Sequence, residues 1–213
     1  MKNDRTLESA AASVPSLSLT VENSLLTAFY ELLQAGFRVR CKVGVSIESL
    51  FYEQFGLNPR LVEGKISTIF LNGKPVDDIR STIVEDEATL ALSGAMPGLV
   101  GATLRRESPL ASFRQSISAG KSAKDNENSE GCIQIKLFNI LLKELGPGFL
   151  EMGIFVQGII YKSFLEKQMS EFWNRCTKIL VDGKPIHTRE FSESYLSMTD
   201  QDLVCLKVML KNS

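Results

Sequence analysis

The stretch Ile69-Phe-Leu-Asn-Gly-Lys-Pro-Val76 reads as an apolar strand that runs into a tight turn, and the chain repeats it almost unchanged as Ile179-Leu-Val-Asp-Gly-Lys-Pro-Ile186. Asn-Gly and Asp-Gly are the pairs that two-residue hairpin turns favour, because both turn residues need a positive φ angle. Pro75 cannot donate to a central ladder, so the return strand belongs at an edge of its sheet. Two hairpins of the same kind predict two related structural units.

The repetition extends to both sides of the turn. Alternation of apolar and polar residues at 17–21 recurs at 133–137, and Ser46, where a helix is predicted to begin, is matched by Ser163. The offsets between matched positions differ by only a few residues, as changes in loop length require. An internal repeat that aligns about 17–93 with 133–208 is therefore predicted.

Each repeat reads as strand, helix, strand, helix, strand, turn, strand. This order predicts an α+β fold of two tandem units, each a mixed sheet with helices on one face. The predicted organisation is a tail at 1–16, a first unit at 17–93 and a second unit at 133–213. Between the units, 94–132 is predicted to hold a glycine-rich crossover, a short helix at Pro109–Ile117 and a polar linker.

The residues around each hairpin resemble those of ubiquitin-like β-grasp domains, in particular the sulfur-carrier group with the thiamine sulfur carrier and the small subunit of molybdopterin synthase. The matching positions are Ile69–Val76 with Asp86–Leu92, and Ile179–Ile186 with Asp200–Leu206. The resemblance implies a β-grasp fold for each unit and a link to sulfur or cofactor metabolism. The carriers end in Gly-Gly, whereas this sequence ends Leu210-Lys-Asn-Ser213, so the carrier activity itself is not expected.

Charge and hydropathy exclude several classes of partner. The chain has 213 residues and a formal net charge of −1, so no overall attraction to nucleic acid or to an anionic membrane is expected. No stretch approaches the roughly 18 apolar residues of a membrane-spanning helix, and the first residues lack the apolar core of a signal peptide. A cytoplasmic protein without nucleic-acid or membrane partners is the expectation.

No group of residues predicts catalysis. None of the cysteines lies in a C-x-x-C pair, and they are interpreted as reduced, mostly buried thiols: Cys41, Cys132, Cys176 and Cys205. His187 is the only histidine and has no nucleophile motif beside it, so it is interpreted as a surface residue. No metal, cofactor or catalytic residue is predicted, and the sequence favours a protein that is not an enzyme while leaving that question open.

The segment Ser93–Arg106 is not repeated and is the candidate site. Its glycines allow close approach of the backbone to a ligand, and two arginines follow at once. Backbone N–H groups and guanidinium groups together suit a phosphate or a carboxylate. The alternative from the same residues is an apolar crossover packed between the units, with solvated arginines. The candidate ligand-binding residues are Gly94, Gly98, Gly101, Arg105 and Arg106.

Three functions remain open from the sequence. The first is a non-enzymatic binding protein for a protein partner or a small anionic ligand. The second, implied by the resemblance, is an accessory factor or enzyme in sulfur or cofactor metabolism. The third is a structural protein that associates with itself, in which the apolar stretch Ala95–Leu104 is the contact of a homo-oligomer.

Overall fold

The computed structural model describes residues 14–95, 98–106, 129–168, 170–186, 199 and 202–211. Contacts divide the chain into two compact units: unit 1 is Met1–Leu32 with Pro147–Ser213, and unit 2 is Leu33–Gly146. Unit 1 therefore joins the two ends of the chain, whereas the sequence predicts two consecutive units. The predicted helix at Pro109–Ile117 and the predicted surface residue His187 lie outside the described residues.

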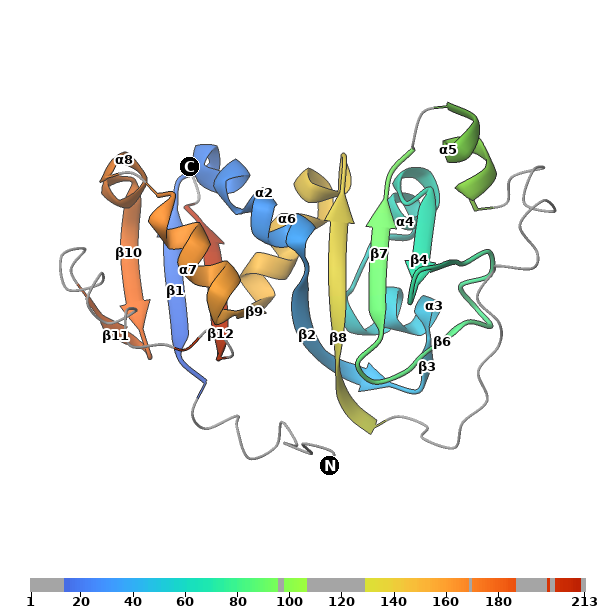
Figure 1. The fold of residues 1–213 in the computed structure, drawn as a ribbon, viewed down its shortest axis with the longest axis horizontal. Helices are drawn as coiled ribbons and strands as arrows, with labels where there is room; N and C mark the ends of the chain where they lie inside the picture. The colour runs from blue at the N-terminus through green and yellow to red at the C-terminus, as the bar shows by residue number, and fades with distance from the viewer. Residues whose placement is uncertain are drawn as a thin grey trace. The chain divides into compact units, whose positions relative to one another are not determined.

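Unit 2 contains a five-stranded mixed sheet (Figure 1). Its strands, in spatial order, are β2 (Phe37–Val43), β8 (Ser129–Phe138), β7 (Thr89–Ser93), β4 (Thr68–Leu71) and β5 (Lys74–Pro75). The central pair, β8 and β7, is parallel, and the other neighbours are antiparallel. One face of the sheet is apolar and buried, with Val39, Ile69, Leu92 and Ile135 each at most 1% exposed. These strands confirm the α+β class predicted from the sequence.

Short helices cover the buried face of the unit 2 sheet. They are α3 (Ile47–Ser49), the π-helical turn η2 (Leu50–Gln54) and α4 (Pro59–Lys65). Helix α5 (Gly98–Leu104) follows β7 in the chain. Ser46 begins α3 as predicted, because its Oγ accepts a hydrogen bond from the N–H of Ser49 at 3.1 Å. Asn58 caps α4 in the same way. A two-stranded sheet, β3 (Val45–Ser46) with β6 (Ile83–Val84), completes the unit.

Unit 1 contains a second five-stranded mixed sheet. Its strands, in spatial order, are β9 (Ile154–Gln157), β12 (Leu203–Leu210), β1 (Ser16–Val21), β10 (Cys176–Val181) and β11 (Lys184–Pro185). The central pair, β12 and β1, is parallel, and the other neighbours are antiparallel. The two units thus have the same number of strands in the same pattern of directions.

Helices α7 (Gly158–Glu166) and α8 (Ser170–Asn174) lie against the unit 1 sheet (Figure 1). The helical segments η1 (Asn23–Phe29), α2 (Tyr30–Ala35) and α6 (Leu141–Met152) complete the fold, and the division between the units falls inside α2 and α6. Three rings form the aromatic core of unit 1: Phe29 lies 5.3 Å from Phe164 and 5.9 Å from Phe172 between ring centroids.

Both hairpin turns make the same contacts. Asn72 and Asp182 have positive φ angles of 50° and 48°. In unit 2, the N–H of Asn72 donates to the carbonyl of Thr89, and the N–H of Thr89 donates to Asn72 Oδ1, both at 2.8 Å. In unit 1, Asp182 forms the same two bonds with Ser16, at 2.9 and 2.7 Å. Because Thr89 begins β7 and Ser16 begins β1, β1 has the place in unit 1 that β7 has in unit 2.

Three predicted boundaries need correction. Strand β8 begins at Ser129, inside the predicted linker at 94–132, because its first residues pair with the end of β2. Strand β1 begins at Ser16, inside the predicted tail at 1–16. Helix α7 begins at Gly158 and not at Ser163. A Cβ on Gly158 would lie 2.3 Å from the carbonyl oxygen of Thr199, so the backbone approaches too closely for any other residue.

Candidate functional site

Gly94, the first residue of the predicted glycine-rich site, has a packing role. Gly94 is buried, and a Cβ there would lie 2.7 Å from Cγ2 of Ile140. Gly98 is exposed and begins α5 with a φ of 79°, and Gly101 is buried within the same helix. Gly94 is thus explained by close contact with a neighbouring side chain and Gly98 by its backbone conformation.

The two arginines that follow α5 have different surroundings. Arg106 donates from Nε and Nη2 to the carbonyl of Ile66 at 3.2 and 2.9 Å, and from Nη2 to that of Val62 at 3.0 Å. These carbonyls lie at the C-terminal end of α4, where a cation is favourable. Arg105 is exposed, and its N–H bonds the carbonyl of Gly101. The structure gives Arg106 the role of a helix cap, and binding of an anion by these residues remains a prediction.

A different site lies on the face of the unit 2 sheet opposite the buried one, called here the outer face. Successive side chains of a strand point to opposite faces, so residues between the buried positions share the outer face. Phe70 on β4, Ala91 on β7 and Phe138 on β8 are such residues, and all three are partly exposed. Two large apolar rings therefore stand at positions where polar side chains are expected.

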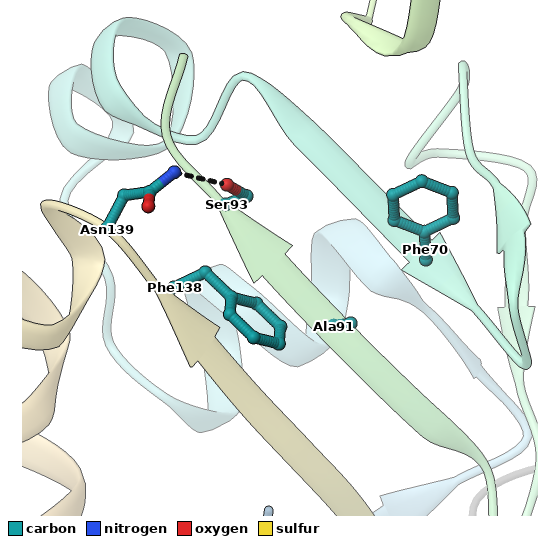
Figure 2. Close-up of a pocket in the computed structure, with 5 residues that line it drawn as sticks. All are labelled: Phe70, Ala91, Ser93, Phe138 and Asn139. Atoms are coloured by element: carbon teal, nitrogen blue, oxygen red, sulfur yellow. Dashed lines mark hydrogen bonds between the residues drawn. The ribbon is translucent and has the colours of Figure 1, made fainter. Parts of the chain in front are cut away.

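These residues line an open hollow of about 270 Å³, called here the Phe70–Phe138 hollow. Phe70 is directly opposite Ala91, and Phe138 is opposite Ser93. Since neighbouring strands are about 4.8 Å apart, the two rings rise from strands about 10 Å apart, with β7 between them. Figure 2 shows the rings on either side of β7 with the small side chain of Ala91 between them. The methyl group of Ala91 leaves the space that a larger residue would fill.

One end of the hollow is polar. Nδ2 of Asn139 donates to Oγ of Ser93 at 3.1 Å, as the dashed line in Figure 2 marks. Asn139 follows β8 directly and has a φ of 57°, a conformation that asparagine tolerates better than most residues. Thr68 is opposite Ser93 on the next strand and fully buried, and its Oγ1 has no hydrogen-bond partner among the described residues. The polar end thus offers an amide and a hydroxyl group beside an apolar recess.

The outer face carries more positive than negative charge. Its strand positions hold four cations and one carboxylate: Arg38, Arg40, Lys42, Lys136 and Glu130. Lys136 is the cation nearest the hollow, because it is opposite Ala91. Arg38 already forms an ion pair with Glu87. Within the part of the chain that the structure describes, the side chain of Lys136 takes part in no hydrogen bond or ion pair.

Cys41, Cys132 and Cys176 do not provide an activated thiol near the site. Burial raises the pKa of Cys41 to about 12 and that of Cys176 to about 11. Burial also raises the pKa of Cys132, although the neighbouring guanidinium of Arg38 acts in the opposite direction. A nucleophilic cysteine needs a lowered pKa. Among the described residues there is no cluster of three His, Cys, Asp or Glu side chains that could hold a metal ion.

The sequence did not identify the hollow, although each strand that forms it was recognised. The available signal was an aromatic residue on the polar side of an alternating strand: Phe70 between two buried residues, and Phe138 directly after the apolar series 133–137. What brings the two rings together is the parallel pairing of β7 with β8, which joins residues 45 positions apart. A pairing over such a distance cannot be derived from local periodicity.

Comparison with family models, with curated proteins and with solved structures gave no match for this chain. The resemblance to ubiquitin-like domains therefore remains a prediction. Within the described ranges, no helix is long and apolar enough to cross a membrane.

Proposed function

We propose that the chain is a non-enzymatic binding protein, and that a protein partner places an apolar side chain in the Phe70–Phe138 hollow. The observation that supports this is the pair of partly exposed rings on the outer face, with Ala91 between them. Aromatic residues are enriched where proteins bind each other, and recesses that accept an anchoring side chain supply much of the binding free energy.

The size of the hollow favours a side chain over a cofactor. Small-molecule sites commonly enclose about 300–1,000 Å³ and bury most of the ligand. The hollow has about 270 Å³ and is open on one side, so it accommodates a single aromatic or branched aliphatic group. The adjacent amide and hydroxyl of Asn139 and Ser93 suit the peptide group that accompanies such a side chain.

A neutral probe tests whether the hollow accepts an apolar group. N-acetyl-phenylalanine amide is added to the labelled protein, and the backbone amide resonances are followed by NMR. A ligand of this size gains about 4 kcal/mol, so saturable shifts at millimolar concentration are expected at Phe70, Ala91 and Asn139. Absence of shifts in this region would contradict the proposal.

A matched pair of variants separates the hollow from any other surface. Ala91→Leu fills the recess and should abolish the shifts, while a retained spectrum elsewhere shows that the protein is folded. Ser18→Leu is the control, because Ser18 is opposite Leu180 on the sheet of unit 1, as Ala91 is opposite Phe70 in unit 2. Ser18→Leu should leave binding of the probe unchanged.

A second candidate function, self-association, is favoured by one residue. Leu99 on α5 is 73% exposed, the most exposed of the large apolar side chains in the described part of the chain. Exposed apolar surface marks a contact between proteins where it forms a contiguous patch. If α5 mediates such a contact, native mass should rise with protein concentration and Leu99→Ser should prevent the rise. A monomer at every concentration would exclude this function.

A further inference from the structure

We infer that the segment recognised by the Phe70–Phe138 hollow is acidic and extended, with carboxylates two or three residues from the apolar anchor. This inference rests on the proposed function and specifies the chemistry of the partner. It depends on the position of Lys136 and of the cations on β2 relative to the hollow.

The cations form a row that leads away from the hollow. Lys136 is opposite Ala91 on the neighbouring strand β8. The side chain of Lys136 extends toward the start of the next strand, β2, because its Cε lies 3.1 Å from the place that a Cβ would take on Gly36, the residue before that strand. Arg38 and Arg40 follow on the outer face of β2. A segment that leaves the hollow across β8 therefore passes over Lys136 first and then reaches arginines.

The spacing of strands determines which residue of the partner meets the cation. Gly36 lies two strands from Ala91, which corresponds to about 10 Å. An extended chain advances about 3.3 Å per residue, so two or three residues cover about 7–10 Å. A carboxylate at that separation from the anchor lies beside the ammonium group of Lys136.

The charges around the hollow select against a basic or neutral segment. Lys136 has no ion-pair partner within the described residues, and Glu130 is the one carboxylate on the strand positions of the outer face. Glu130 is the second residue of β8 and Phe138 the last, so the carboxylate is at the far end of the strand from the hollow. Positive potential around a recess favours an acidic partner and raises its rate of association.

The test uses a synthetic peptide that reads the same in both directions, with blocked ends and the sequence Asp-Asp-Gly-Phe-Gly-Asp-Asp. Its analogue has asparagine in place of each aspartate. NMR titration of the full chain at low salt should give a dissociation constant about tenfold lower for the acidic peptide, and the difference should decrease as salt is added. Equal affinity of the two peptides would overturn the inference while leaving the proposed function intact.

Two charge reversals locate the effect. Lys136→Glu should weaken binding of the acidic peptide about tenfold and leave the asparagine analogue unaffected. The control is Lys207→Glu, since Lys207 is opposite Ser18 in unit 1 as Lys136 is opposite Ala91 in unit 2. Unchanged affinity in Lys136→Glu, or an equal loss in Lys207→Glu, would overturn the assignment of Lys136.

Three further outcomes distinguish failure of this inference from failure of the proposed function. If neither peptide nor N-acetyl-phenylalanine amide shifts the resonances of the hollow, the proposed function fails and the inference fails with it. If the same resonances shift with protein concentration in the absence of peptide, a second copy of the chain is the occupant and the acidic segment is excluded. Loss of binding of both peptides in Ala91→Leu, with the charge preference present in the unmodified chain, supports both conclusions.

Discussion

The two sheets share one arrangement but build its centre from different parts of the chain. In unit 2, the strand beside the hairpin is β7, the last strand before the crossover at 94–128. In unit 1, that place belongs to β1, which comes from the start of the chain, and β12 lies beyond it. The predicted repeat aligns 17–21 with 133–137, yet β1 has the place of β7 and not that of β8. Equivalent positions in space are therefore not the positions that the sequence aligns.

The outer faces of the two sheets differ at equivalent places. Where unit 2 has Phe70, Ala91 and Phe138, the pairing of strands places Leu180, Ser18 and Met209 in unit 1. The rings are thus replaced by flexible aliphatic side chains, and the alanine by a polar residue. Lysine is kept, as Lys136 and Lys207. The difference indicates that the aromatic recess is a property of unit 2 and not a requirement of the sheet, and it supplies a control for each variant of the hollow.

Removing β1 should have the largest effect and should be confined to unit 1. A chain that starts at residue 22 lacks the strand that pairs with both β10 and β12. Amide groups of β10 and β12 should lose protection from hydrogen exchange, while those of β8 and β7 should keep it. A chain that starts at residue 14 is the control. Retained protection of β10 would show that β12 can pair with β10, as β7 pairs with β4.

Core substitutions should destabilise the units by comparable amounts. Phe29 in unit 1 and Phe51 in unit 2 are both fully buried, and replacement of either by alanine should cost about 3–5 kcal/mol of unfolding free energy. Phe29→Ala should lie at the upper end, because Phe29 also contacts two rings in the aromatic core. Denaturant unfolding followed by NMR measures each value. A larger loss in Phe51→Ala would contradict the role given to the aromatic core.

Substitution of the first turn residue by alanine should destabilise both hairpins by similar amounts, although one residue is an asparagine and the other an aspartate. Asn72→Ala and Asp182→Ala each remove an acceptor for a backbone N–H and force alanine into a positive φ. A loss of about 1–2 kcal/mol is expected for each. Asp182→Asn keeps the acceptor and the tolerance of positive φ, so thermal unfolding should change little. A loss of stability in Asp182→Asn equal to that in Asp182→Ala would show that the charge, and not the hydrogen bond, stabilises the turn.

Local features were predicted well from the sequence, and long-range features were not. The turn at Asn72, the cap at Ser46 and the strand at 133–137 depend on neighbours within a few residues, and all three are confirmed. The place of β1 depends on pairing with β12, whose residues are almost 190 positions away. The alternation of residues 17–21 does not specify which of the two central, parallel positions in the sheet the strand occupies.

The candidate site shows the same limit. Arg106 was predicted to bind an anion because arginines that follow glycines suit one. In the structure the guanidinium group of Arg106 caps α4. That role depends on the position of helix 59–65, which lies 40 residues earlier. The hollow depends on Phe70 and Phe138 meeting across β7. Periodicity in the sequence predicted which segments form strands, but it did not predict the order of those strands in the sheet.

The thiols of Cys41 in unit 2 and Cys176 in unit 1 should react at different rates. With pKa values of about 12 for Cys41 and about 11 for Cys176, the thiolate fractions at pH 8 are about one in ten thousand and one in a thousand. Iodoacetamide should therefore modify Cys176 about ten times faster than Cys41, as measured by mass spectrometry of the digested protein. Faster reaction of Cys41 would contradict its burial.

The same thiols make stability fall at alkaline pH. Their folded-state pKa values lie above the ordinary value of 9.0, so folding favours the neutral thiol. This contribution is fully present below pH 9 and is lost as the pH rises from about 9 to about 12. Cys41→Ser should weaken the alkaline dependence seen in denaturant unfolding, and an unaltered dependence would show that other groups cause it.

Replacement of two buried threonines by valine should have the smallest effects on stability, and the two effects should be opposite in sign. In the described part of the chain Thr68 Oγ1 has no hydrogen-bond partner, whereas Thr82 Oγ1 donates to the carbonyl of Asp78 at 2.6 Å. Both residues are at most 4% exposed. Valine has the same shape without the hydroxyl, so Thr68→Val should raise the unfolding free energy by up to about 1 kcal/mol, and Thr82→Val should lower it by about 1 kcal/mol.

The sign of the Thr68 change bears on the hollow as well as on stability. Thr68 is opposite Ser93, whose hydroxyl already accepts a hydrogen bond from Asn139. If Thr68→Val stabilises the chain and leaves binding of N-acetyl-phenylalanine amide unchanged, the unpartnered hydroxyl belongs to the core of unit 2. Loss of binding in a stabilised Thr68→Val variant would instead make Thr68 part of the polar end of the hollow, with the bound peptide group as the partner of its hydroxyl.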